Sequence, residues 1–393
     1  MKTNKRVIFF TLCIQMLMFT SGIASSQALT EQRKIDLIRT PNEGIQPQAA
    51  VDDTGVLHLI YFKGNPSAGD IFYVSKEPGD EGFSQPIRVN SQSGSAIAMG
   101  NIRGAHIAVG RNRRVHVSWM GSKNAEPKGP QDETPMLFSR LNDQKTTFEP
   151  QRNIIQFATG LDGGGSVAAD KKGNVYVAWH AGEHGKGDRA RRVWVARSSD
   201  EGRTFTREVP ASDESKGACG CCGMRAYAAH DGTLYLLYRA ATGGVDRDMY
   251  LVTSGDQGKT FQSSRLHEWK IEACPMSTAS ISEGADGVRL AWETNGQVYY
   301  SKVGHNSLKN SSPVQAPGES NRRKHQATVS NAQGETLFVW TEKMGWKQGG
   351  TLAWQVFDRA GKPTTTKGQA EGVPVWSLIT AYASPGGSFT IIY

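Results

Sequence analysis

Apolar and polar residues alternate over short stretches along most of the chain, and the clearest example lies between residues 163 and 205. There the small-residue run Ser166–Asp170 is followed by the alternating runs Asn174–Trp179 and Arg192–Arg197. A period of two residues, bounded by clusters of Gly and Asp at such short spacing, is typical of antiparallel strands. The segment is therefore predicted to form a four-stranded meander.

The predicted unit ends in the octapeptide Ser198-Ser-Asp200-Glu-Gly202-Arg-Thr204-Phe205, and Ser254-Gly-Asp256-Gln-Gly258-Lys-Thr260-Phe261 repeats the same pattern further along. In such a turn the carboxylate and the hydroxyl satisfy backbone amides, Gly takes a positive-φ position, and the aromatic ring packs on the sheet. The pattern resembles the Asp-box, or BNR repeat, of the sialidase (neuraminidase) superfamily, of which this chain would be a divergent member. The resemblance implies a β-propeller with the box at the turn between the third and fourth strands of a blade. Both aspartates are accordingly interpreted as structural and not catalytic.

Hairpins of the same kind recur about every 50 to 60 residues, a spacing that indicates an all-β propeller of four-stranded antiparallel blades. The second strands of the seven hairpins are expected at 56–62, 114–119, 174–179, 233–238, 288–292, 335–340 and 388–393. Seven blades are predicted, with six as the alternative. A lone strand at 35–39 is expected to join the last hairpin in one shared blade, so that residues 29–393 form a single domain.

The composition agrees with this fold class. The chain has 393 residues, of which 44 are glycine and 38% are hydrophobic, and it shows no sustained helical periodicity after its first residues. Many turn formers together with enough apolar residues for a large core favour one repetitive all-β domain over several unrelated ones.

The first residues have the features of a secretory signal peptide. Lys2, Lys5 and Arg6 precede the apolar run 7–19, and small residues follow as far as Ala28. This apolar run is shorter than the ~20 residues that a membrane anchor needs. We therefore expect residues 1–28 to be removed, and the mature protein to have no membrane span and to be secreted or periplasmic. The formal net charge of +8 comes from scattered Lys and Arg, which, together with export, argues against nucleic acid as a partner.

Propellers bind ligands on the face formed by the loops between blades and by the loops between second and third strands, here called the top face. The Asp-box turns lie on the opposite face. Arginines on the top face are suited to binding anions, with ion pairing inside the fold as the alternative. The candidate substrate-binding residues on the top face are Arg103, His180, Arg225 and Arg239. The candidate catalytic carboxylates are Asp70, Glu293 and Glu342.

The resemblance also implies a catalytic pattern that can be compared with this sequence. A sialidase binds the sialic acid carboxylate with three arginines, attacks with a tyrosine activated by a glutamate, and uses an aspartate as acid/base. Ile45 stands where the first arginine is expected, and Lys63, at the end of the same hairpin, cannot form a bidentate clamp. Asp70 falls near the place of the acid/base aspartate, although a turn residue is the alternative. Near the place of the nucleophile the aromatic residue is Trp376, which offers no nucleophile.

Tryptophans recur at the ends of the predicted second strands. Regular recurrence of this kind favours packing between blades over a role as platforms for sugars. These residues are Trp119, Trp179, Trp292 and Trp340.

Four cysteines are expected to meet on the top face, because Cys219-Gly-Cys221-Cys222 and Cys274 lie in loops that lead into neighbouring blades. In an exported protein four cysteines most simply form two disulfides, with three pairings open. A soft-metal site for copper or zinc, with Met276 as a further ligand, is the alternative. No metal or other cofactor is favoured.

The sequence thus predicts an exported sialidase-like propeller that binds or hydrolyses a carbohydrate, with a glycan or glycoconjugate as its partner. If it is an enzyme, we expect a glycosidase of the sialidase type. A non-catalytic scaffold that binds another protein on the top face is the alternative, and metal chemistry at the cysteines is a third.

Overall fold

The computed structural model describes Met1 and residues 34–182, 186–304, 309–319 and 322–393. Residues 2–28 of the expected signal peptide lie outside the described residues. Within the described part of the chain the secondary structure is almost entirely β-strand, without an α-helix, and no helix is long and apolar enough to cross a membrane. Short 3-10 helices occupy loops at Pro41–Glu43, Arg111–Arg113, Pro130–Asp132, Asp188–Ala190 and Glu214–Lys216.

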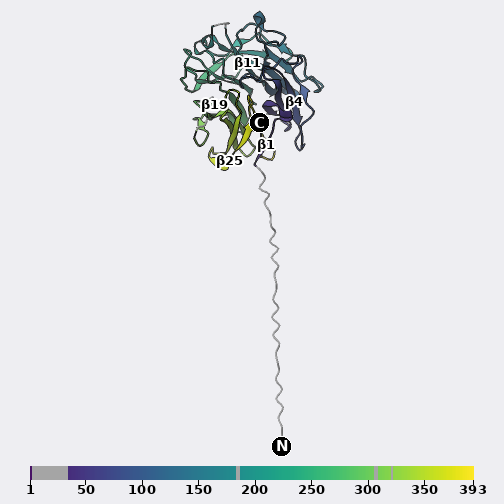
Figure 1. Cartoon of the computed structure of the whole chain (residues 1–393), viewed down its shortest axis with the longest axis vertical. Coiled ribbons are helices and arrows are strands. Elements are labelled where there is room, and N and C mark those ends of the chain that lie inside the picture. Colours follow the sequence, from purple (N-terminus) through teal and green to yellow (C-terminus); the bar gives the residue numbers. More distant parts are fainter. Residues whose placement is uncertain (2–33, 183–185, 305–308, 320–321) are drawn as a thin grey trace. The chain divides into compact units, whose positions relative to one another are not determined.

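Seven sheets follow one another in chain order around a ring, as Figure 1 shows, which confirms the prediction of seven blades. Blade 1 contains β2 (Ile45–Val51), β3 (Leu57–Asn65), β4 (Ala68–Lys76) and β5 (Ile87–Arg88). Blade 2 contains β6 (His106–Val109), β7 (Val115–Met120), β8 (Met136–Arg140) and β9 (Arg152–Asn153). Blade 3 contains β10 (Gly165–Ala169), β11 (Val175–Ala181), β12 (Arg192–Ser198) and β13 (Val209–Pro210).

The second half of the ring continues the pattern. Blade 4 contains β14 (Arg225–Ala228), β15 (Leu234–Arg239), β16 (Met249–Ser254) and β17 (Gln262–His267). Blade 5 contains β18 (Ala279–Gly284), β19 (Gly287–Thr294), β20 (Gln297–Val303) and β21 (Val314–Gln315). Blade 6 contains β22 (Lys324–Ser330), β23 (Thr336–Glu342), β24 (Gly350–Phe357) and β25 (Pro363–Val373). Blade 7 contains β26 (Thr380–Ala383), β27 (Phe389–Ile392) and β1 (Ile35–Ile38).

The seventh blade closes the ring with strands from both ends of the domain. β1 pairs with β27 from Ile35 opposite Phe389 to Ile38 opposite Ile392, so the predicted sharing of one blade is confirmed. Blade 7 has three strands, however, and β1 runs parallel to β27, unlike the antiparallel four-stranded blades elsewhere. No hairpin connects these two strands, so no tight turn forces them to be antiparallel. In Figure 1 the C-terminus lies beside β1.

The hydrophobic core is divided into seven clusters, and each cluster fills the space between two neighbouring blades. Because both faces of each sheet contribute apolar residues, no blade can bury its apolar surface without its neighbours. The four tryptophans that end second strands are buried in these clusters, with Trp179 and Trp292 at 0% exposure. Their predicted role in blade packing is confirmed.

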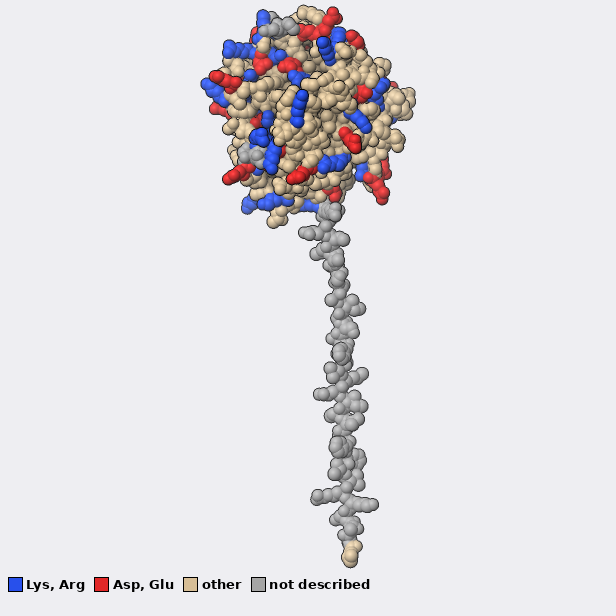
Figure 2. Space-filling view, viewed as in Figure 1, with Lys and Arg blue, Asp and Glu red and all other residues tan. Residues whose placement is uncertain are grey.

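The inner strands contact one another in the order β2, β6, β10, β14, β18, β22, β26 and back to β2. They enclose an axial cavity of about 490 Å³. Its lining runs from Asn101, Gly223 and His325 near the top face to Asp53 and Lys171 near the opposite face. On the molecular surface in Figure 2, basic and acidic side chains are interspersed, without a large area of one sign on the visible face.

Candidate functional site

The two Asp-box turns form the same hydrogen bonds. In the first, Ser198 Oγ donates to Asp200 Oδ1 at 2.6 Å, and the Thr204 amide and hydroxyl donate to the same carboxylate at 2.9 and 2.6 Å. In the second, Asp256 accepts from Thr260 at the same distances and from Ser254 Oγ at 2.8 Å. Partial burial opposes ionisation of Asp200, but the bonds from Ser198 and Thr204 lower its pKa to about 2. Because the Asp200 carboxylate accepts hydrogen bonds within its own turn, its role there is structural, as the sequence predicted.

Arg225, the first residue of the inner strand β14, points its guanidinium towards other inner strands across the axial cavity. Its Nη1 donates to Gln48 Oε1 of β2 at 2.8 Å and to His106 Nδ1 of β6 at 3.0 Å. The Ser166 hydroxyl oxygen of β10 also lies 2.8 Å from His106 Nδ1. Four blades therefore contribute one polar side chain each to a network at the wall of the cavity. We call this set, Gln48, His106, Ser166 and Arg225, the channel network.

The channel network holds a positive charge that no carboxylate neutralises. Arg225 forms no ion pair with any described carboxylate, and its Nε is buried without a hydrogen-bond partner. Burial lowers the pKa of Arg225 to about 10, which still leaves it charged at neutral pH. Burial and the nearby Arg225 hold the pKa of His106 well below its ordinary value, so the ring is neutral and accepts through Nδ1. An unpaired buried cation is costly unless an anion can approach it.

A second set of residues meets over the axis on the top face. A Cβ added at Gly100 would lie 2.9 Å from Arg103 Nη1, 3.1 Å from Met276 Cε and 3.5 Å from Trp346 Cζ3, so these side chains converge from three different loops. Trp346 is 57% exposed, and its ring packs edge-on against Trp376 with centroids 5.9 Å apart. Exposed aromatic faces beside polar groups are suited to contact with a sugar ring.

The loop 100–102 connects this aromatic pair with the axial cavity. Gly100 lies close to Trp346, whereas Asn101 and Ile102 line the cavity. Asn101 Nδ2 donates to the carbonyl oxygen of Ser377, the residue after Trp376, at 2.7 Å. The sequence did not single out Trp346, although a tryptophan in the polar, Gly-rich stretch 343–350 is a signal that could have found it.

The other predicted binding residues are engaged within the fold. Arg103 forms an ion pair with Asp162 at 2.8 Å, with 20% of its side chain exposed. Arg239 is buried and donates from Nε to Ser277 Oγ at 2.9 Å and from its two terminal nitrogens to the carbonyl oxygens of Arg247 and Glu293. His180 is also buried; its Nε2 lies 2.8 Å from the carbonyl oxygen of Cys222, and burial lowers its pKa.

The three candidate catalytic carboxylates belong to three different blades. Asp70 accepts hydrogen bonds from Asn90, Ser93 and the Gly94 amide, as a residue that organises a loop does. Glu342 accepts from Arg323 and from Trp340 Nε1. Glu293 differs from both, since burial raises its pKa and its Oε2 is buried without a hydrogen-bond partner. A retaining glycosidase needs two carboxyl groups about 5 Å apart. These three carboxylates lie on strands of three blades, and each has its own hydrogen-bond partners.

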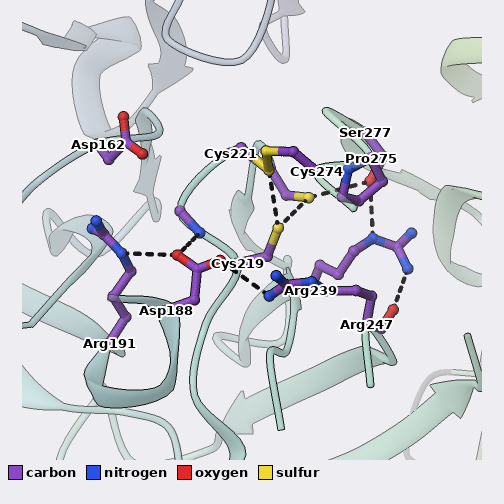
Figure 3. The surroundings of a disulfide bond; sticks show 12 residues. Asp162, Asp188, Arg191, Cys219, Cys221, Arg239, Arg247, Cys274, Pro275 and Ser277 are labelled. Carbon is purple, nitrogen blue, oxygen red and sulfur yellow. Dashed lines mark hydrogen bonds and ion pairs between the residues drawn. A yellow bond between two sulfur atoms is a disulfide. The ribbon is translucent and has the colours of Figure 1, made fainter. Parts of the chain in front are cut away.

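The cysteines meet as predicted, in loops of blades 4 and 5, but these four residues form one disulfide and not the two that were expected. Cys221 and Cys274 form a disulfide that joins the two loops (Figure 3). Cys219 and Cys222 are buried free thiols. The thiol sulfurs of Cys219 and Cys222 are 2.7 Å apart, and Cys219 Sγ is 3.5 Å from Cys221 Sγ. The methyl group of Met276, the further ligand of the alternative metal site, lies close to Gly100.

Comparison with known proteins places the fold. No protein-family model matches the sequence, and no curated protein matches it. The structure is similar to the Hadza microbial sialidase Hz136, with a TM-score of 0.52 and 16% sequence identity over 84% of this chain and 74% of that chain. It is similar to the GH93 α-L-arabinofuranosidase of Fusarium graminearum, with a TM-score of 0.53 and 9% identity over 84% and 98% of the two chains. The NanB sialidase from Streptococcus pneumoniae gives a TM-score of 0.52 and 8% identity over 79% and 67%. The chain therefore has the β-propeller fold of sialidases and GH93 arabinofuranosidases, with a sequence far removed from both.

Proposed function

We propose that this protein is an exported carbohydrate-binding propeller that recognises an anionic saccharide at the top of its axial cavity. The observation that carries the proposal is Arg225, a cation at the wall of a 490 Å³ cavity with no carboxylate partner among the described residues. Cavities of about 300 to 1,000 Å³ are typical of small-molecule sites. The carboxylate of an acidic sugar would form an ion pair with Arg225, which has no carboxylate partner among the described residues.

The surrounding residues have complementary roles in this proposal. Gln48 and His106 hold one guanidinium nitrogen, which leaves the other nitrogens of Arg225 to an acidic ligand. The Trp346–Trp376 pair, connected to the cavity through the loop 100–102, offers an apolar surface to the sugar ring. The glycosidase propellers with the same fold support a carbohydrate as the ligand class.

The test is calorimetric titration of the purified protein with sialic acid, with uronic acids and with their neutral counterparts, after a glycan array has ranked the ligands. We expect binding of acidic sugars that Arg225→Gln abolishes and that Arg113→Gln, an exposed arginine near the opposite face, leaves unchanged. Binding of neutral and acidic sugars with equal affinity would contradict the role of Arg225. A protein that binds no saccharide would contradict the proposal as a whole and favour a protein-binding scaffold.

Hydrolysis is the second candidate function, and Glu293 favours it. A buried carboxyl with a raised pKa and an unsatisfied oxygen has the property that a general acid needs. A panel of fluorogenic sialosides and arabinosides would measure turnover. Activity that Glu293→Gln removes, while Glu342→Gln retains it, would assign the reaction to Glu293, whereas an inactive panel leaves binding as the function.

A further inference from the structure

Four sulfur atoms form a path from the interior to the surface between blades 4 and 5. Cys222 and Cys219 are buried, at 1% and 0% exposure, and their sulfurs are 2.7 Å apart. Cys219 Sγ then lies 3.5 Å from Cys221 Sγ, which is bonded to Cys274, an exposed residue. A buried dithiol is thus in contact with one end of a disulfide whose other end faces solvent.

The loop that carries three of these cysteines is held firmly by its neighbours. The Cys219 amide donates to the Arg239 carbonyl oxygen at 2.9 Å, and the Cys222 amide closes a turn onto the Cys219 carbonyl oxygen at 3.2 Å. Asp188 accepts from the Gly220 amide at 3.1 Å, and the Gly223 amide donates to the Ser277 carbonyl oxygen at 2.9 Å. These bonds fix Cys219 and Cys222 in a Cys-x-x-Cys turn, the arrangement found in redox-active thiols.

The electrostatic surroundings favour a thiolate at this position. Arg239 lies beside the pair, and its Nε donates to Ser277 Oγ, which in turn is 3.7 Å from Cys222 Sγ. Arg247 is ion-paired with Asp188 at 3.1 Å on the other side of the loop (Figure 3). Burial opposes ionisation of Cys222, but the Cys219 thiol and the charge of Arg239 lower its pKa, while the hydrogen bond to Cys222 and burial raise that of Cys219. Of the two thiols, Cys222 therefore ionises more readily, and Cys219 is then the hydrogen-bond donor of the pair.

We propose that Cys219, Cys221, Cys222 and Cys274 form a thiol–disulfide exchange centre that passes two electrons between the buried pair and thiols or disulfides at the protein surface. The described chain contains the buried dithiol, the disulfide next to it and the exposed sulfur that such an exchange requires.

Electrons and protons balance when the two cysteine pairs exchange their disulfide. Cys222 takes the proton of Cys219 as Cys219 Sγ attacks Cys221 Sγ; the Cys221–Cys274 bond breaks, and Cys274 leaves as a thiolate that takes a proton from water. After losing its proton again, Cys222 attacks Cys219, and Cys221 leaves as the second thiol. The result is a Cys219–Cys222 disulfide and a Cys221/Cys274 dithiol. An external disulfide, from a small molecule or from an exported protein, then reoxidises the outer pair and is itself reduced to two thiols.

The test is stepwise redox titration of the purified protein with alkylation and non-reducing peptide mapping. One equivalent of a phosphine reductant, added to fully oxidised protein, should give molecules with two thiols. We expect both pairings, Cys219–Cys222 and Cys221–Cys274, in this two-thiol state. The Cys274→Ser variant should contain only the Cys219–Cys222 disulfide.

Two rate measurements test whether electrons leave through Cys274 and whether the external disulfide belongs to a small molecule or to a protein. Reduced wild-type protein should react with glutathione disulfide and with oxidised thioredoxin, and Cys274→Ser should react on the order of tenfold more slowly, because burial protects Cys219 and Cys222. Faster reaction with thioredoxin than with glutathione disulfide would indicate a protein partner, and the reverse a small thiol. Circular dichroism of Cys274→Ser checks that the variant is folded, and Ser264→Ala, at an exposed serine of β17 away from the four cysteines, is the matched control.

Three results would overturn the proposal. One is a two-thiol state that contains the Cys221–Cys274 disulfide alone, since exchange would then be absent. Another is a Cys274→Ser variant that reacts as fast as the wild type. The third is stoichiometric copper or zinc with four thiols that alkylate only after a chelator is added, since the cysteines would then be metal ligands.

Discussion

On the opposite face, the turns at Asp200 and Asp256 repeat the same hydrogen bonds with almost the same distances, whereas the three arginines predicted on the top face have three different surroundings. Arg103 is ion-paired with Asp162, Arg225 faces the cavity without a carboxylate, and Arg239 is buried among backbone carbonyl oxygens. Repetition therefore marks the residues that hold each blade together. Departure from repetition occurs on the face where we propose that a ligand binds.

The largest effect on the free energy of unfolding is expected from the Cys221–Cys274 disulfide on the top face. The Cys221–Cys274 bond closes a loop with a sequence separation of 53 residues. The chain-entropy relation gives a loop of this length about 4 kcal/mol of stability. Cys274→Ser should lower the free energy of unfolding by that amount in chemical denaturation, and Cys219→Ser, which keeps the cross-link, should lower it by much less. Equal losses in the two variants would show that the cross-link is not what stabilises this face.

A smaller effect is expected from the Asp-box turn. Asp200→Asn removes a charge that accepts three hydrogen bonds and should cost about 1 kcal/mol at neutral pH. Because the pKa of Asp200 is lowered in the folded state, to about 2, its contribution is complete above the unfolded value near 4 and is lost as the pH falls towards 2. Denaturation midpoints at pH 6, 3 and 2 should therefore converge for the two proteins. A difference that persists at pH 2 would refute this assignment.

The smallest effect on stability is expected at Trp346, which is exposed and packs only against Trp376 among the described aromatic rings. Trp346→Ala should change the free energy of unfolding by at most about 0.5 kcal/mol. If the proposed function holds, the same variant should weaken saccharide binding on the order of tenfold, or ~1.4 kcal/mol. If the affinity is unchanged, the Trp346–Trp376 pair does not contact the saccharide, and the channel network alone binds it.

The fold could be predicted from sequence because its rules are local and repeated. Alternation located the strands, two Asp-boxes identified the blade, and recurrent tryptophans such as Trp179 and Trp292 indicated the packing between blades. The parallel direction of β1 could not be predicted, since no turn connects it with β27.

The site could be predicted only in part. That the two cysteine loops would meet followed from propeller topology, whereas the pairing of Cys221 with Cys274 depended on side-chain directions that spacing does not encode. Arg225 and Arg239 looked equivalent in sequence. The difference between them comes from partners on other blades, Gln48 and His106 for Arg225 and Ser277 for Arg239. The convergence of Trp346 with the Gly100 loop is likewise a contact between distant segments.

The parallel pairing of β1 with β27 also governs how the ring is assembled in time. A contact between residues as distant as Ile35 and Phe389 forms late, because a loop that contains nearly the whole domain must close first. Until then blade 7 lacks its third strand, and the apolar cluster between blades 6 and 7, which contains Phe389 and Ile391, lacks its contact with Ile35. A newly synthesised chain therefore passes through a period in which the β1 of another copy could pair with its β27. A high concentration of such chains would favour strand-swapped dimers. The yield of monomer would then depend on the rate of synthesis as well as on the stability of the finished ring.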